Sequence, residues 1–209
     1  MANKVQNTEA DVMVEAKGKL ELFFDKWGNK ILYALVVIGV VIGAFFIVRN
    51  FIDRKHEGKE QAASVAMANA ATAEAYAAVA DDYAGTAAGN TSAYMAGAEY
   101  LKAGDLANAQ KYLEMYKDAE GAAGELINAQ AYGLRGDLAV EQNDLQSALA
   151  MFAKAVEASD DAFTYATFMH KSALVHQAMG NDAEAQQCYK DIVAKYPQTE
   201  SQYGRYIKE

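Results

Sequence analysis

The sequence is poor in cysteine, proline and tryptophan, with one of each among its 209 residues. A single cysteine excludes an internal disulfide and an all-cysteine zinc site. A single proline, in a chain that is 52% hydrophobic, excludes a proline-rich disordered linker and favours long uninterrupted helices. Positive charge is also scarce: the net charge of −9 argues against a nucleic-acid-binding protein, which needs a basic face for phosphates.

Sequence patterns of common catalytic and cofactor sites are absent. There is no H-E-x-x-H, G-x-x-x-x-G-K-[ST], G-x-S-x-G or G-x-G-x-x-G. His170 and His176 fall six residues apart on one expected helix, so they point in different directions and make a poor metal pair. Cys188 is interpreted as a buried packing thiol. We therefore expect a protein that is not an enzyme and that has no catalytic residue, metal or cofactor.

Negative charge is concentrated in the C-terminal part of the chain. Residues 61–209 carry 10 basic and 20 acidic side chains, whereas residues 1–60 carry 9 and 8. We therefore expect the two parts to meet different surroundings.

The longest apolar run is ILYALVVIGVVIGAFFIV, residues 31–48, between Lys30 and Arg49. As a helix it would span about 27 Å, close to the hydrocarbon thickness of a bilayer. A cleaved signal peptide is the main rival, but the run starts late and lacks a small-x-small cleavage pattern. We therefore predict an uncleaved transmembrane helix at 31–48, in contact with the lipid bilayer. Basic residues flank both sides equally, so charge does not determine its orientation.

Gly39 and Gly43 form a G-x-x-x-G pattern inside this run. Two glycines on one helical face would let another membrane helix approach closely, which would make the chain a homo-oligomer. Chance is the alternative, because glycine is common in membrane helices. Around the run we predict an N-terminal tail at 1–30 and a helical stalk at 49–66, where charged helix-forming residues dominate.

Internal repeats occupy the remaining region, residues 67–209. Three segments align, at 92–116, 131–156 and 166–197. Each has a small residue, a turn pair seven residues later, an alanine twelve residues after the small residue, and a large apolar residue four further on. In chain order the sets are Gly97, Gly104-Asp105, Ala109 and Leu113; Gly136, Asn143-Asp144, Ala148 and Phe152; and Ala173, Gly180-Asn181, Ala185 and Tyr189.

Each shared position has a physical role in a pair of antiparallel helices. The small residue allows close helix contact, and the glycine or asparagine permits the positive φ that ends a helix. The following Asp or Asn can cap the next helix, whose alanine and large residue share one face. Such pairs bury their apolar faces only by stacking. A leading helix near Tyr76–Tyr83 and a short polar cap at 202–209 would close the two ends.

These positions resemble the tetratricopeptide repeat, and the resemblance covers residues 67–209. It implies an all-α fold, an α-solenoid of helix pairs after the membrane helix. The third repeat also keeps the family's terminal proline, as Pro197, whereas Ala139 and His176 replace the helix-A aromatic residue that Tyr100 supplies in the first.

The overall layout is similar to the single-span repeat proteins of Bacteroidota-type bacteria. In particular, it resembles the ancillary subunit of the Sec translocon that carries a periplasmic repeat domain. This resemblance implies a bacterial inner-membrane protein with a cytoplasmic N-terminal tail at 1–30 and a periplasmic repeat domain.

In tetratricopeptide proteins the first helix of each pair lines the inner surface, so the resemblance implies a partner-binding groove there. The alternative is that this face is only solvated and that partners bind elsewhere. The Lys/Asn/Arg set with which some relatives hold a terminal carboxylate is absent, and a slightly acidic groove suits an apolar or basic segment. Transferred by position, the groove residues are Tyr94, Ala98, Leu101, Lys102, Gln130, Gly133, Asp137, Glu141, Thr167, His170, Leu174 and Gln177.

Together these features favour a membrane-anchored protein–protein interaction module. Its partners would be Sec translocon subunits, exported proteins or another envelope complex, for which it would act as a chaperone-like scaffold subunit. One alternative is a structural membrane protein that forms homo-oligomers without a dedicated client. Another is an enzyme with a dispersed site, which is least favoured because helical repeats display surface rather than a closed pocket.

Overall fold

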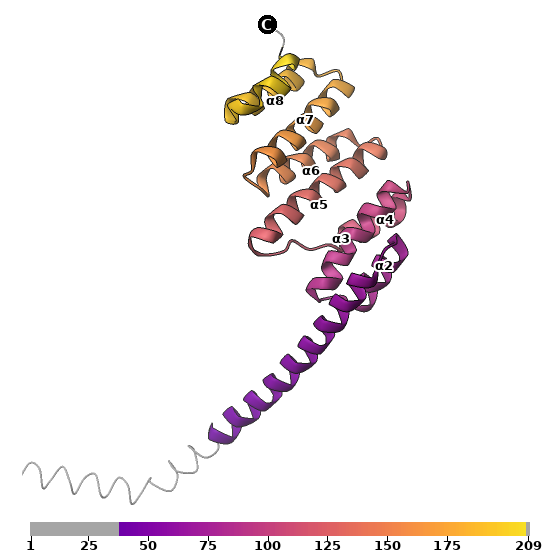
Figure 1. Cartoon of the computed structure of the whole chain (residues 1–209), viewed down its shortest axis with the longest axis vertical. Helices are drawn as coiled ribbons and strands as arrows, with labels where there is room; N and C mark the ends of the chain where they lie inside the picture. The colour runs from indigo at the N-terminus through magenta and orange to yellow at the C-terminus, as the bar shows by residue number, and fades with distance from the viewer. Residues whose placement is uncertain (1–37, 208–209) are drawn as a thin grey trace, which may run out of the picture. The chain divides into compact units, whose positions relative to one another are not determined.

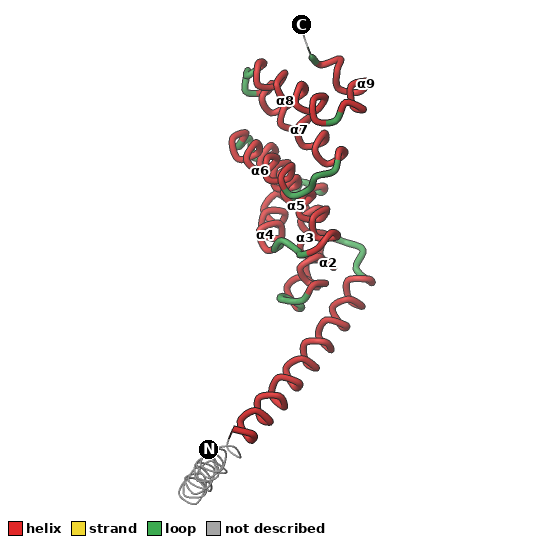
Figure 2. The backbone as a smooth tube through the Cα atoms, turned by 90° about the vertical axis from the view of Figure 1, so that its left-hand side faces the viewer, coloured by secondary structure: helices red, strands yellow, loops and turns green. Residues whose placement is uncertain are grey.

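A computed structural model of the chain describes residues 38–207, and every regular element in that range is a helix (Figure 2). The chain divides into two compact units between Glu57 and Gly58. The second unit contains the three predicted repeats.

In the first unit, residues 38–57 are helical and their apolar side chains are exposed all around the helix. Phe45 is 59% exposed and Ile47 is 73% exposed. The predicted membrane helix 31–48 begins outside the described residues, and the predicted tail 1–30 lies wholly outside them. Across residues 38–207, no helix combines the length and the apolarity that crossing a bilayer requires.

The second unit begins with a helix that continues to residue 69 and is fixed to the first repeat. The Glu60 carboxylate accepts hydrogen bonds from the backbone N–H groups of Ala87 and Ala88, at 3.0 and 3.1 Å. These N–H groups are at the start of a helix, where no intrahelical acceptor exists. The predicted stalk 49–66 is helical throughout, but its second half belongs to the repeat unit rather than to a separate element.

Helices then follow one another as antiparallel neighbours, stacked in chain order (Figure 1). This arrangement confirms the predicted all-α stack of helix pairs. The elements are α2 (Ala73–Asp82), α3 (Ala87–Lys102), α4 (Leu106–Met115), α5 (Gly121–Glu141), α6 (Leu145–Glu157), α7 (Ala162–Ala178), α8 (Asp182–Lys195), η1 (Pro197–Thr199), α9 (Glu200–Tyr203) and η2 (Gly204–Tyr206).

The turns inside the pairs have the predicted backbone conformation, with φ of 78° at Gly104, 58° at Asn143 and 78° at Gly180. The next residue starts the second helix. Asp105 and Asp144 accept hydrogen bonds from the backbone N–H groups of Asn108 and Ser147, both at 3.1 Å. Asn181 makes no such side-chain bond, so the capping prediction is wrong at the third turn.

Within each pair, the predicted small residue packs against the predicted large one. A Cβ placed on Gly97 would lie 2.7 Å from Cγ of Leu113, and one on Gly136 would overlap the ring of Phe152. Ala173 and Tyr189 are both buried in the core of the last pair. Close helix contact therefore depends on this pair of positions in every repeat.

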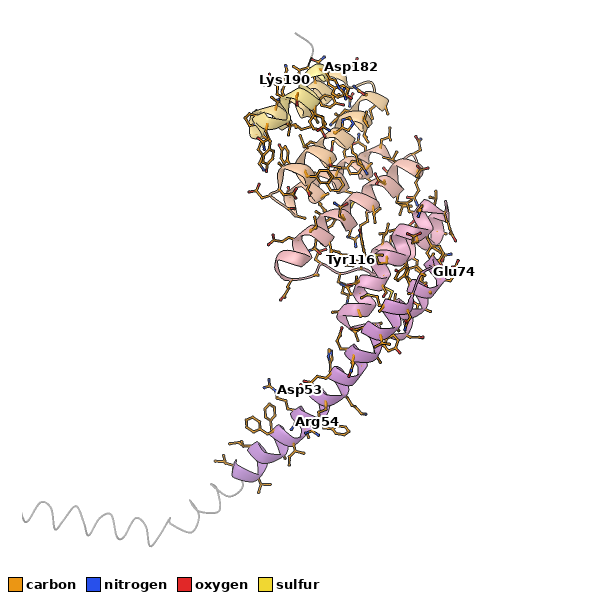
Figure 3. The ribbon with its side chains drawn as sticks, viewed as in Figure 1. Asp53, Arg54, Glu74, Tyr116, Asp182 and Lys190 are labelled. Atoms are coloured by element: carbon orange, nitrogen blue, oxygen red, sulfur yellow. The ribbon has the colours of Figure 1, made fainter. Side chains whose placement is uncertain are left out.

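Tyr116 and Arg135 join the first pair to the second, and Figure 3 labels Tyr116 where the chain passes toward α5. Tyr116 is buried, and its hydroxyl donates to Oδ1 of Asn128 at 2.6 Å. The Arg135 guanidinium donates to the carbonyl oxygens of Leu113 and Tyr116, at 2.6 and 2.9 Å. These bonds satisfy the carbonyl groups that the end of α4 leaves unpaired.

The C-terminal tail closes the last pair with aromatic rings rather than with the expected polar cap. Tyr203 is buried, and the Tyr206 ring stacks on Tyr189 with 4.7 Å between centroids. His170 lies against the same rings, and its Nδ1 is 3.1 Å from the Tyr189 hydroxyl. For the described residues 202–207 the prediction of a polar cap is wrong, because this segment covers apolar surface that the last pair cannot bury alone. Residues 208–209 lie outside the described range.

Candidate partner-binding groove

The candidate site lies along α3, α5 and α7, the first helices of the three pairs. α5 contacts both neighbours. Because the pairs repeat at intervals of 39 and 37 residues, equivalent residues of the three helices follow one another across the stack. The helices end at Lys102, Glu141 and Ala178, and all three of these residues line the site.

The first hollow lies between α5 and α7, above the second helix of the middle pair, and has a volume of about 280 Å³. Aliphatic and aromatic side chains dominate its lining, so a partner side chain placed there would gain mainly from apolar burial. The lining residues are Asp137, Val140, Leu145, Phe152, Lys171, Leu174, Val175 and Ala178.

The second hollow lies between α3 and α5 and has a volume of about 350 Å³. It shares Asp137 and Val140 with the first, so the two hollows form one continuous groove across three helices. Val140 is 38% exposed and Leu174 is 47% exposed, which leaves aliphatic surface available along the groove. The remaining lining residues are Ala98, Leu101, Lys102, Leu134 and Glu141.

An ion pair crosses the middle of the groove from α5 to α7. Lys171 Nζ donates to both carboxylate oxygens of Asp137, at 2.6 and 2.7 Å, and both side chains are about one third exposed. The equivalent positions between α3 and α5 are Ala98 and Leu134, which are apolar. The groove is therefore apolar at this level between α3 and α5, and carries an ion pair between α5 and α7. The two charged side chains of that pair are hydrogen-bonded to each other.

Two further charged side chains are at the groove's edge. Lys102 lies 3.5 Å from a carboxylate oxygen of Glu99, one turn earlier on the same helix. Glu141 is exposed, and no ion-pair partner for it occurs among the described residues. A partner would consequently meet a negative charge at the end of α5.

Half of the twelve predicted groove residues line these hollows: Ala98, Leu101, Lys102, Asp137, Glu141 and Leu174. The other six line neither: Tyr94, Gln130, Gly133, Thr167, His170 and Gln177. Tyr94 instead packs on Tyr116, with 5.9 Å between ring centroids, and burial raises its pKa. Whether the lining residues bind a partner stays a prediction.

The placement of His170 and Gly133 on an open groove is wrong. Burial among the C-terminal rings lowers the pKa of His170, and the charge of Arg205 lowers it further. Gly133 is buried, and a Cβ there would overlap the ring of Phe168 on α7. These are equivalent positions of two repeats, and each contacts the element that follows its own pair: Gly133 contacts α7, and the half-buried His170 contacts the rings of the C-terminal tail.

Val140 is the central groove residue that sequence reasoning missed. It is the equivalent of Leu101 one repeat later, 39 residues on, so the repeat interval could have identified it. Leu134 and Val175 were missed for a different reason: they are partly or wholly covered side chains whose contribution depends on the spacing of the helices.

Two kinds of group in the described part of the chain bear on metal binding and reactivity: the side chains that could ligate a metal ion, and the one thiol. Within the described range 38–207, no cluster of three or more His, Cys, Asp or Glu side chains could hold a metal ion. Cys188 is buried as predicted, and burial raises the pKa of its thiol, with the negative charge of Asp191 adding to the effect. A thiol with a raised pKa is a weak nucleophile at neutral pH.

Gly39 and Gly43 fall on the described part of the first unit. A Cβ added at either position would meet nothing within 4 Å. The space beside both glycines is therefore open in the single chain.

Comparison with known proteins agrees with the helix-pair architecture. Residues 129–161 and residues 168–199 each match the tetratricopeptide repeat family. These matches confirm the second and third predicted repeats; residues 92–116 lie outside both, although α3 and α4 form a similar pair. No curated protein matches the chain by sequence.

The crystal structure of MamA is similar to this chain, with a TM-score of 0.50 and 19% sequence identity. The match covers 65% of this chain and 72% of MamA. At this identity the likeness shows the fold alone, an all-helical repeat arrangement. Tetratricopeptide repeats are protein–protein interaction modules, and this chain contains such repeats.

Proposed function

We propose that this protein is a membrane-anchored scaffold whose repeat unit holds a segment of a partner protein in the groove of α3, α5 and α7. The observation that carries the proposal is the pair of adjoining hollows that share Val140 and Asp137. Exposed aliphatic side chains, Val140 and Leu174 among them, line these hollows. Such a surface is typical of an interaction site.

The anchor is the apolar segment 31–48, in a single-pass arrangement. The all-round exposure of side chains such as Phe45 and Ile47 supports it, because such a helix is stable only with apolar surroundings. By its layout the protein sits in a bacterial inner membrane with the repeat unit in the periplasm. Its partners there are Sec translocon subunits, exported proteins in transit or another envelope complex.

A crosslinked pull-down of the full-length protein from gently solubilised membranes tests this function, with mass spectrometry as the readout. Leu174→Glu places a charge in the groove and should remove the partner. Leu126→Glu is the matched control, because Leu126 is 52% exposed on α5 and lines neither hollow. Equal recovery of partners with both variants would exclude the groove as the binding site.

Fractionation tests the anchor separately. The protein should stay in the pellet after carbonate extraction at high pH, because an inserted helix is not released by disrupting polar contacts. Release into the supernatant would contradict the anchored arrangement while leaving the groove proposal intact.

Homo-oligomerisation through the first unit is the second candidate function. The open space beside Gly39 and Gly43 favours it, since two such helices can approach closely at glycine. Gly39→Leu together with Gly43→Leu should then abolish dimers in detergent. Dimers that persist in this double variant would show that the two glycines do not form the dimer contact.

A further inference from the structure

Three features of the lining indicate what kind of segment the groove binds. This inference rests on the proposed function. The first feature is the supply of hydrogen-bond partners for the backbone N–H and C=O groups of a bound segment. The hollow between α5 and α7 offers only two polar side chains, Asp137 and Lys171, and these already bond to each other. An extended peptide would leave its N–H and C=O groups without partners there, whereas a helix pairs them internally.

The second feature is the size and chemistry of the hollow between α5 and α7. Its volume of about 280 Å³ is lined by Val140, Phe152, Leu174, Val175 and other apolar side chains. This space suits one large aliphatic side chain of a partner helix. The second hollow, next to Leu101 and Leu134, can receive another from the adjacent turn.

The third feature is the charge at the groove's edge. Lys171 is paired with Asp137, and Lys102 lies 3.5 Å from a carboxylate oxygen of Glu99, so among the described lining residues Glu141 is the charge without an ion-pair partner. Glu141 is also the last residue of α5, whose final turn contains no basic residue. The partial negative charge of the helix end therefore adds to the carboxylate, and both favour a cation.

We propose that the groove binds an amphipathic helix of a partner protein that carries aliphatic side chains on one face and lysine or arginine beside them. The aliphatic face fills the two hollows, and a basic side chain lies against Glu141 at the end of α5. The excess of acidic residues in 61–209, twenty against ten basic ones, adds long-range attraction for such a partner.

Two synthetic helices serve as probes: one with a leucine face and a lysine polar face, the other with the same leucine face and a glutamate polar face. Their binding to the full-length protein in uncharged detergent micelles is followed by fluorescence anisotropy. We expect the lysine helix to bind wild type at least fivefold more tightly than the glutamate helix. Detergent binding is the same background for every variant, so comparisons are made between variants.

Charge reversal at the groove gives the decisive comparison. Glu141→Lys should lower the affinity for the lysine helix about fivefold to tenfold and raise the affinity for the glutamate helix, as expected for reversing one exposed charge. Glu157→Lys is the matched control, because Glu157 is the last residue of α6, is exposed and lines neither hollow. If Glu157→Lys has the same effect as Glu141→Lys, overall charge explains the binding and the proposed contact is wrong.

The apolar contact is tested in parallel with Leu174→Glu and its control Leu126→Glu. Suppose that Leu174→Glu abolishes the binding of both synthetic helices, but Glu141→Lys changes the affinity of neither. The groove would then remain the binding site, and the proposal that its occupant is basic would be wrong. Unchanged binding with Leu174→Glu would overturn the groove itself, and with it the proposed function. All four variants should keep the wild-type thermal unfolding curve, because each substituted side chain is exposed.

Discussion

Gly136 on α5 lies directly against Phe152 on α6: a Cβ on the glycine would overlap Cε1 of the phenylalanine ring, sixteen residues later in the chain. Phe152 is 1% exposed and packs in the core of the middle pair. The same interval separates Gly97 from Leu113, where an added Cβ would also be too close. The absence of a side chain at one helix thus sets how closely the second helix can approach.

Gly136→Ala should lower the free energy of unfolding by about 1–3 kcal/mol, because the added methyl group overpacks a core without free space. Urea unfolding followed by far-UV circular dichroism measures this. Phe152→Leu in the same chain should recover part of the loss, giving a non-additive pair. Gly58→Ala is the control, since a Cβ on that helical residue meets nothing within 4 Å and should be neutral or stabilising. Equal losses at both glycines would contradict the close-contact explanation.

The turn inside the first pair depends on the left-handed conformation of Gly104, whose φ is 78°. Gly104→Ala should lower the free energy of unfolding by about 1 kcal/mol, because a Cβ is strained in this region. Gly104→Asn should have less than half of that effect, since asparagine tolerates this conformation and stands at the equivalent turn as Asn143. Urea unfolding of the two variants checks the order, and a larger loss for asparagine would contradict it.

Acid should weaken the helix starts that aspartates cap. Hydrogen bonds to side-chain and backbone groups of Asn108 and Ser147 lower the pKa of Asp105 and Asp144 from the ordinary 3.8. A carboxylate with a lowered folded-state pKa stabilises the fold above pH 3.8, and the contribution is lost as pH falls below it.

Replacing both residues by asparagine, Asp105→Asn with Asp144→Asn, should flatten this part of the stability profile, because asparagine can cap without titrating. Unfolding midpoints in urea between pH 5 and pH 2.5 provide the measurement. A wild-type-like slope in the double variant would show that other carboxylates dominate the acid response.

The aromatic C-terminal cap should loosen in mild acid. Burial, with Arg205, lowers the pKa of His170 from 6.5, so the folded state holds its neutral form. Stability from this group is complete above pH 6.5 and is lost as pH falls through the lowered value, because the unfolded chain binds the proton more readily. His170→Leu should remove the pH dependence of the thermal midpoint between pH 7.5 and 5.5, whereas Tyr206→Ala should lower the midpoint at every pH. An unchanged pH dependence in His170→Leu would exclude this histidine.

The helix pairs, their turns and their close contacts follow from local patterns in the sequence. Small residues, turn residues and large apolar residues recur at fixed intervals, and each acts through neighbours a few residues away or through its own partner helix. That is why Gly104, Asn143 and Gly180 could be assigned positive φ, and Gly136 a close contact, from the sequence alone.

Which surface of the stack is open depends on how the helix pairs pack on one another. Val140 lines the groove because α5 lies between α3 and α7. Gly133 and His170 occupy equivalent positions in their helices, and the elements that follow their own pairs pack against them. The ion pair of Asp137 and Lys171 likewise joins residues of different repeats. Contacts between repeats depend on the distance and rotation between stacked helix pairs, and the residue spacing within one repeat does not specify either. The surface that faces a partner is formed by these contacts, so it could not be predicted from the spacing.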